Sequence, residues 1–413
     1  MKTFTGFEYL LIDVANHFGH DKLTFEARLE WAKGNLEQLE QMVDLAEEKP
    51  LYVKAVMAIR KAQAGIPTGH LVGFDAVCSG VQIMSALTGC KVGAWATGMV
   101  DPDIRSDAYG TCTQAMRAIL GKDVGITRKQ AKDAMMTAYY GSKLEPIKIF
   151  GEDTPELAAF YAAAHKTAPG AWSLLQDLLA SWNPNALEHS WQLPDGFNAK
   201  VKVMVQKETR VEVDELDHAT FTYVYYDNEC VKKRPANAAN VIHSIDAYVL
   251  RSIHRRCNYN REVAENADKL IQTELIKRSM GLDGFWTEVN EKVIYYCDQY
   301  NRTGIVDVVI LPHLAARDMG YLSKEHLQEL AEVLTEMLEY QPFEVVTIHD
   351  EYKCHPNNMN VLRKQYINML CALADSRLIE DILSQIYGGS GGKYVKQSED
   401  LSKLIRHSNY ALC

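Results

Sequence analysis

Two short apolar segments, far apart in the chain, each lead into an aspartate. Residues 71–75 read LVGFD and residues 345–350 read VVTIHD. Their β-branched and aromatic residues predict two half-buried strands. Two strands of one antiparallel sheet would bring Asp75 and Asp350 together, and two rigidly placed aspartates are enough to hold a pair of divalent cations. The fold must therefore bring together segments that lie far apart in the sequence.

A predicted helix between the two strands carries functional residue types four positions apart. Thr127 is a suitable N-cap, and nothing breaks the helix before about residue 140. Residues four apart form one slowly drifting stripe on a helix. Arg128 and Lys132 can bind the oxygens of a triphosphate. Met136 would pack under a base, and Tyr140 would reach a ribose or a template base.

These segments, taken in order, resemble the motifs of the phage-type single-subunit DNA-directed RNA polymerases, a family that includes the mitochondrial enzymes. Residues 74–82 (FDAVCSGVQ) resemble motif A, residues 127–143 resemble motif B, and residues 348–350 (IHD) resemble motif C. Residues 12–28 and 240–246 (NVIHSID) resemble two further segments of that family. Both the order and the spacing of the motifs agree with the family.

The resemblance implies template-directed RNA synthesis by a two-metal mechanism. The implied ligands of two Mg²⁺ ions are Asp75, Asp350 and the carbonyl group of Ala76. His349 would orient the strand of Asp350. Lys22 would approach the incoming triphosphate, together with the two basic residues of the helix.

The resemblance also favours ribonucleotides over deoxyribonucleotides. Gly80 stands where related DNA polymerases carry a glutamate that closes the space for a 2′-hydroxyl, and Met136 stands where they usually place phenylalanine. His243 matches a family histidine that helps to recognise the 2′-hydroxyl, either directly or by orienting Tyr140. Three residues are expected along the template path or at the junction of fingers and palm: Tyr109, Gly141 and Ser142.

The implied fold is α+β and mostly helical, with the palm and fingers of a right-hand polymerase but without the family's N-terminal domain and thumb. Residues 1–104 would form the first part of the palm and residues 105–243 the fingers. Residues 244–413 would complete the palm and include a helical insertion at about 255–340. Within the fingers, period-two alternation at 200–205 and 220–226 predicts a hairpin.

Several expectations concern partners. The C-terminal residues 409–413 resemble the family's C-terminal foot, which folds back near the catalytic centre. The family's Asp-x-x-Gly-Arg-type palm element has no counterpart in residues 1–70. We therefore expect a second, smaller subunit that carries the thumb and the palm arginine. This chain would be the large catalytic subunit of a two-subunit RNA polymerase of the kind found in certain short-tailed bacteriophages. DNA template, RNA product, NTPs and a single-stranded-DNA-binding activator complete the expected partners.

Composition adds constraints on location and on nucleic-acid contacts. A net charge of −10 is unexpected for a nucleic-acid enzyme, so basic residues must be concentrated locally. Candidate phosphate contacts are residues 232–234 and the cluster of Arg251, His254, Arg255 and Arg256. Nine cysteines without a Cys-x-x-Cys pair argue against a disulfide framework or a zinc finger. With no signal peptide and no spanning segment, we expect a soluble protein of the cytoplasm, that of the host cell if the protein is viral.

Two alternatives remain open. One is a related DNA polymerase or primase-like enzyme, which the triplet His349-Asp350-Glu351 favours and which Gly80 and His243 oppose. The other is a non-enzymatic subunit derived from a polymerase. The two aspartates, two basic residues and tyrosine are all present. This argues against a subunit that has lost its activity, because a scaffold has no need of all five.

Overall fold

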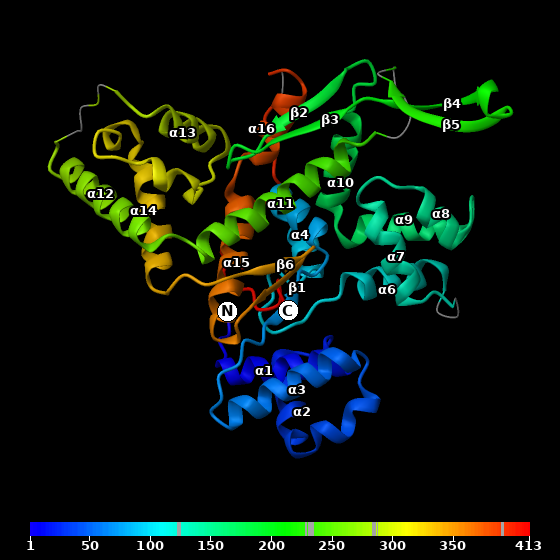
Figure 1. The fold of residues 1–413 in the computed structure, drawn as a ribbon, viewed down its shortest axis with the longest axis horizontal. Coiled ribbons are helices and arrows are strands. Elements are labelled where there is room, and N and C mark those ends of the chain that lie inside the picture. Colours follow the sequence, from blue (N-terminus) through cyan, green and yellow to red (C-terminus); the bar gives the residue numbers. More distant parts are fainter. Residues whose placement is uncertain (122–124, 228, 230–234, 283–285, 287, 390–391) are drawn as a thin grey trace.

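A three-stranded antiparallel sheet in the order β1-β7-β6 lies at the centre of the computed structural model (Figure 1). Its strands are β1 (Val72–Asp75), β6 (Val346–Ile348) and β7 (Glu351–Cys354). The two predicted strands therefore belong to one sheet, on either side of β7. The structure describes residues 1–121, 125–227, 229, 235–282, 286, 288–389 and 392–413.

Strand β1 buries its apolar side chains on one side of the sheet, because alternate side chains of a strand face opposite sides. Val72 and Phe74 are buried, whereas Asp75 is exposed at the end of the strand. The Phe74 ring lies 5.9 Å from that of Tyr9 and 5.5 Å from that of Phe25, measured between centroids. This packing fixes the register of the strand, and a one-residue slip would turn the aspartate into the core.

The sheet is backed by a helical layer. Its main members are α4 (Ser79–Thr88), α11 (Asn237–Cys257) and α15 (Met359–Asp375), and α15 packs against both of the others. The buried Gln82 side chain of α4 joins three segments. Its amide nitrogen donates to the carbonyl oxygens of Thr97 (3.0 Å) and Ala411 (2.9 Å), and its oxygen accepts from the Tyr366 hydroxyl at 2.7 Å. The C-terminus is thus held beside the central helices.

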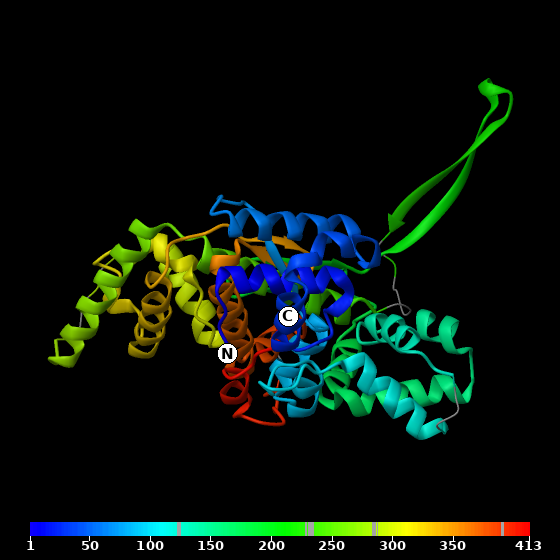
Figure 2. The ribbon, with the colours of Figure 1, turned by 90° about the horizontal axis from the view of Figure 1, so that it is seen from below.

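The N-terminal part is helical and covers one side of the sheet (Figures 1 and 2). Thr5 and Glu8 form a capping box at the start of its first helix. Its elements are α1 (Gly6–Ala15), the π-helix η1 (Asn16–His20), α2 (Phe25–Gly34), the 3₁₀ helix η2 (Leu36–Leu45) and α3 (Lys49–Gln63).

A second helical group follows the sheet strand β1 and lies on the opposite side from the insertion (Figure 1). It consists of α5 (Lys91–Ala96), α6 (Ala108–Leu120), α7 (Arg128–Ala138), α8 (Leu144–Phe150), α9 (Pro155–Thr167) and α10 (Pro169–Ala180). Strands β2 (Glu188–Gln192) and β3 (Asn198–Lys202) pair next, and they precede a longer hairpin.

The predicted pairing of residues 200–205 with 220–226 is wrong. Strand β4 (Val205–Val213) pairs with β5 (Ala219–Asp227) across the 3₁₀ turn η3 (Asp214–Leu216), whereas residues 198–202 pair with β2. Figure 2 shows this hairpin projecting away from the rest of the molecule. Both faces of β4 meet solvent, and Lys207 and Thr209 interrupt the alternation of its valines that would have revealed the strand.

The segment between α11 and β6 forms its own hydrophobic core, from Tyr259 to Met337. Its elements are α12 (Arg261–Ser279), α13 (Glu291–Thr303), the 3₁₀ turns η4 (Val308–His313) and η5 (Met319–Tyr321), and α14 (Lys324–Leu338). This core lies within residues 255–340, for which a helical insertion was expected; that the segment is an insertion stays a prediction. The chain ends with η6 (Pro356–Asn358), α15, α16 (Leu378–Ile386) and α17 (Leu401–Ile405).

Arg363 on α15 ties both ends of the chain to the core. The side chain is 1% exposed. Its guanidinium donates to the Lys2 carbonyl (3.0 Å), the Tyr9 hydroxyl (2.9 Å) and the Asn409 carbonyl (2.8 Å). It also lies 4.6 Å from the centroid of the Phe25 ring. No carboxylate of the described chain pairs with it, so neutral acceptors and aromatic faces alone compensate this buried charge.

We expect Arg363→Ala to lower the free energy of unfolding by about 3 kcal/mol, because several buried acceptors lose their donor. Chemical denaturation measures this loss. The matched control is Lys364→Ala on the next position of the same helix, where only a half-exposed ion pair with Glu336 at 3.1 Å is lost; the expected change there is below about 1 kcal/mol. Equal effects of both substitutions would contradict the role of Arg363.

None of the helices in the described ranges combines the length and apolar content needed to cross a membrane. The candidate phosphate contacts at residues 232–234 lie outside the described residues.

Candidate functional site

A cavity of about 500 Å³ opens where β1 ends, between the N-terminal helices and α7. It brings together eight of the residues expected from the sequence. They are Lys22, Asp75, Ala76, Tyr109, Arg128, Lys132, Met136 and Asp350. These residues come from five separate parts of the chain, so the fold and not local sequence assembles them.

The two aspartates lie at the same edge of the sheet. Asp75 is the last residue of β1 and stands opposite Glu351 in the register of β7. Asp350 lies in the two-residue turn between β6 and β7, and its carbonyl accepts a hydrogen bond from the Ala76 amide at 3.1 Å. Asp350 was expected to end its strand. It lies instead in the turn just beyond the strand.

Three carboxylates, those of Asp75, Asp350 and Glu351, gather at this edge of the sheet. Burial, followed by the negative charges of Glu351 and Asp350, raises the pKa of Asp75 to about 6. Lys353 forms an ion pair with Glu351 at 2.7 Å. An edge where carboxylates repel one another favours a divalent cation, and oxygen donors are the ligands that Mg²⁺ prefers. The residues present thus fit a Mg²⁺ site.

Helix α7 begins as expected from the sequence. The Thr127 hydroxyl accepts from the Gln130 amide at 3.2 Å, and the Gln130 side chain accepts from the Thr127 amide at 2.9 Å. The helix ends at Ala138, earlier than expected, because Gly141 adopts a φ of +90° and Ser142 N donates to the Thr137 carbonyl. Tyr140 therefore lies in the turn after the helix.

The two basic residues of α7 that line the cavity differ in their partners. Arg128 is bound to Asp107 through both Nε (2.6 Å) and Nη2 (2.8 Å). Lys132 forms no ion pair with any described residue; its Nζ lies 6.0 Å from the Tyr109 ring centroid. Tyr109 also contacts the Arg128 guanidinium, 5.3 Å from the ring centroid. Of the basic residues of α7 that line the cavity, Lys132 is thus the one without a carboxylate partner in the described chain.

Lys22 lies in a loop whose conformation is stabilised by hydrogen bonds from the buried side chain of Arg28. Arg28 donates to the Asn16 side chain (2.9 Å) and to the carbonyl groups of Asp21 (2.8 Å) and Leu23 (2.9 Å). The Lys22 ammonium pairs with the Asp21 carboxylate. The loop follows the π-helix, a conformation that is often found at functional sites.

Tyr140, Gly80 and His243 form a second group next to the cavity. The rings of Tyr140 and His243 lie 4.7 Å apart between centroids. A Cβ atom added to Gly80 would overlap the Tyr140 hydroxyl. The absence of a side chain at Gly80 therefore makes room for the tyrosine, a close approach that the sequence alone did not reveal.

Residues 3–148 match the family described as DNA-dependent RNA polymerase. This part of the chain resembles RNA polymerases. It contains Asp75, Lys132 and Tyr140, which the fold gathers at or beside the cavity. A DNA-directed RNA polymerase of Pseudomonas phage phiKMV is 24% identical over 303 residues, which is 59% of this chain. The chain spans 37% of the length of that relative.

Other expected polymerase residues lie outside the cavity wall. His349 is exposed in the β6–β7 turn with a φ of +56°, and its side chain has no hydrogen-bond partner among the described residues. Gly141 and Ser142 form the turn after α7. Their roles stay predictions.

Sequence reasoning missed two side chains at this site, those of Asp107 and Asp246. Asp107 binds Arg128, and the separation of these two residues in the sequence gives no sign of the contact. Asp246 on α11 faces the site; burial, together with the charge of Asp350, raises its pKa to about 6. The Cys413 amide donates to the Asp75 carbonyl at 3.1 Å. The C-terminus therefore returns to the strand that carries Asp75, where the sequence led us to expect it.

The cluster expected to contact phosphate is engaged in other contacts. Arg251 binds Asp195 at 2.7 Å, and Arg255 bridges Asp195 (3.3 Å) and Asp307 (2.8 Å). Arg256 is buried. These arginines join α11 to neighbouring loops, so three of the four candidates hold the fold together and are not free phosphate contacts.

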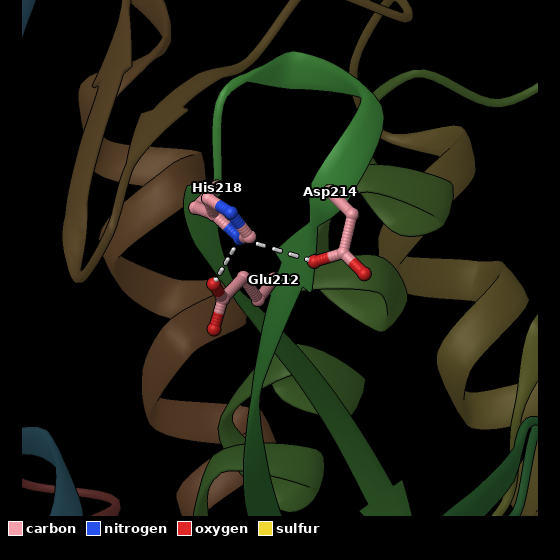
Figure 3. Close-up of side chains that lie close together, drawn as sticks. All are labelled: Glu212, Asp214 and His218. Carbon is pink, nitrogen blue, oxygen red and sulfur yellow. Dashed lines mark ion pairs between the residues drawn. The ribbon is translucent and has the colours of Figure 1, made fainter.

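One cluster of three metal-binding residue types occurs within the described ranges, and it lies elsewhere. Glu212, Asp214 and His218 meet at the tip of the β4–β5 hairpin (Figure 3). His218 Nδ1 lies 2.8 Å from the Glu212 carboxylate and 3.2 Å from that of Asp214. All three side chains are exposed, and the histidine already pairs with both carboxylates. The cluster therefore gives no argument for a bound metal.

Proposed function

We propose that this chain is a catalytic subunit of a DNA-directed RNA polymerase, which transfers ribonucleoside monophosphates from NTPs to an RNA 3′ end. One observation carries the proposal. Two aspartates from distant segments meet at one sheet edge, and the same cavity presents Lys22, Arg128 and Lys132. A site with cation-binding carboxylates facing phosphate-binding cations suits phosphoryl transfer, where positioning and charge neutralisation dominate.

In this mechanism Asp75, Asp350 and the Ala76 carbonyl would hold two Mg²⁺ ions. When bound, such ions supply activation of the attacking hydroxyl and charge neutralisation at the leaving pyrophosphate. Lys132 binds the triphosphate directly, since it has no competing carboxylate. Arg128 must loosen its contact with Asp107 to do the same, so we assign it a positioning role before the nucleotide arrives. Lys22 approaches from the opposite wall, and Met136 supports the base.

Selection of ribose is assigned to Tyr140, Gly80 and His243. The alternative function, a related DNA polymerase, is favoured by Glu351 directly after Asp350. The contact between the Tyr140 and His243 rings favours the first function, because a histidine there can orient the tyrosine and offer a hydrogen bond to a 2′-hydroxyl.

For His243→Ala we expect the preference for rNTPs over dNTPs to fall roughly tenfold, the value of one hydrogen bond. The comparison of kcat/KM for UTP and dTTP measures it. His254→Ala, an exposed histidine on the same helix, is the control. An unchanged preference would remove His243 from ribose selection.

We extend the proposal to the partners. DNA template and RNA product would run along the cavity, and the projecting β4–β5 hairpin would contact the template. A second, smaller subunit would supply the palm arginine element that residues 1–70 lack, and an activator that binds single-stranded DNA would assist. Purification of a fully active enzyme containing this chain alone would count against the second subunit.

Metal binding separates the polymerase from a non-enzymatic subunit. Electron paramagnetic resonance of Mn²⁺ added with a non-hydrolysable NTP should report two bound ions, and Asp75→Asn should lose them. Glu212→Gln, in the hairpin-tip cluster, is the matched control and should retain both. If Asp75→Asn binds as many ions as the unsubstituted chain, a non-enzymatic role becomes the better account.

A further inference from the structure

A second cavity, of about 790 Å³, lies away from the candidate polymerase site. Its lining residues come mainly from α14, from α15 and from the end of α13. The proposed polymerase mechanism uses none of its lining residues.

Carboxylates line this cavity in a row. Four of them lie on one face of α14 at intervals of four, three and four positions: Glu325, Glu329, Glu332 and Glu336. At 1.5 Å per residue the row is about 16 Å long. Asp375 at the end of α15 also lines the cavity. Like charges aligned over three helical turns destabilise a helix unless something neutralises them.

Among the carboxylates of this row, only Glu336 at one end forms an ion pair with a described residue. Glu336 accepts from the side chains of Gln365 (2.6 Å) and Asn368 (2.8 Å) and pairs with Lys364 at 3.1 Å. Glu329 accepts only from the Tyr300 hydroxyl at 3.1 Å. Burial and the nearby carboxylates, first that of Glu332, raise the pKa of Glu329.

The other three carboxylates, those of Glu325, Glu332 and Asp375, form no ion pair with any residue in the described part of the chain. Two of the three arginines on the walls donate to main-chain carbonyls: Arg377 to Asn301 (2.7 Å) and Arg256 to Val306 (3.2 Å). Arg406 also lines the cavity, so its walls carry five carboxylates and three guanidinium groups, an excess of two negative charges.

The buried side-chain amide of Gln365 is a second, independent observation that points to a ligand in this cavity. Gln365 is 1% exposed and lines the cavity. Its Nε2 donates to Glu336, which fixes the orientation of the amide. Its Oε1 is then left with no donor among the described residues. A buried amide oxygen normally has a hydrogen-bond partner, so this acceptor is available to a donor group of a ligand.

We propose that this groove binds a linear aliphatic polyamine, whose ammonium groups pair with the row on α14 and whose end donates toward Gln365. A row of acceptors about 16 Å long suits a thin, extended polycation with charges at intervals. The walls offer few apolar anchors, with Val306, Val333 and Ala372 as the main ones. A docked protein segment would need larger apolar pockets.

Isothermal titration of the full chain with spermine tests this site. We expect saturable binding of one spermine per chain in low salt. Glu325→Gln combined with Glu332→Gln should weaken it about tenfold, the value of two exposed charge contacts. The charge-matched control, Asp214→Asn with Glu215→Gln at the hairpin tip, should bind like the unsubstituted chain. Thermal unfolding of both variants verifies that they fold.

Three outcomes would overturn the proposal. The first is no saturable binding of spermine by the unsubstituted chain. The second is equal weakening in the groove variant and the hairpin-tip control, which would mean non-specific attraction to net charge. The third is binding of a lysine-rich peptide with at least a tenfold preference over spermine, which would assign the groove to a basic polypeptide.

Discussion

Replacing Asp350 by asparagine is expected to lower nucleotide incorporation at least about a thousandfold, because loss of one cation-binding carboxylate removes several kcal/mol of transition-state stabilisation. Asp75→Asn should have the same effect. Single-turnover incorporation on an RNA–DNA scaffold measures both. A variant with near-normal activity would end the assignment of the two aspartates.

The same substitutions should leave the fold intact. Because the pKa of Asp75 is raised from 3.8 to about 6, the folded chain binds more protons than the unfolded chain between these values. The ionised carboxylate thus disfavours folding at neutral pH, and this penalty develops as the pH rises through that interval. In EDTA at pH 7, Asp75→Asn should unfold at no lower temperature than the unsubstituted chain. Lower thermal stability would mean that the lost activity reflects misfolding.

Replacing Lys132 by alanine is the second large change. We expect incorporation to fall about a hundredfold, comparable to removal of one preorganised charge-stabilising donor. Lys132 lines the cavity and is not held by a carboxylate of the described chain, in contrast to Arg128. The apparent KM for NTP should rise as well, since the lysine meets the triphosphate in the ground state.

Lys129→Ala is the matched control for this change. Lys129 is exposed on α7 and does not line the cavity. Its loss removes the same charge from the same helix and should change incorporation less than threefold. If both lysine variants lose activity equally, then the net charge of α7, and not a specific contact, supports the reaction.

Local patterns predicted local structure well. The apolar runs before Asp75 and Asp350 form strands of one sheet, as their β-branched and aromatic residues predicted. Only β1 is half-buried, however, because Val346 and Ile348 of β6 are exposed. Thr127 caps α7, since a threonine followed three positions later by glutamine is a readable signal. The end of the same helix was placed too late, because a single glycine with positive φ decides it.

Contacts between distant segments could not be read from the sequence. The pairing of Arg128 with Asp107 joins two helices, and no pattern marks it. Gly80 and Tyr140 approach each other only after α4 and α7 pack. The β4–β5 hairpin was assigned to the wrong first strand because Lys207 and Thr209 interrupt the apolar alternation of β4. The first two contacts arise only from tertiary packing.

The most direct test of the central claim is extension of an RNA primer annealed to a DNA template, with Mg²⁺ and this chain as the only protein. Parallel reactions contain rNTPs or dNTPs, and Asp350→Asn serves as control. The account predicts template-directed addition of ribonucleotides that the substitution abolishes. Extension with dNTPs but not rNTPs, or extension that survives Asp350→Asn, would contradict it.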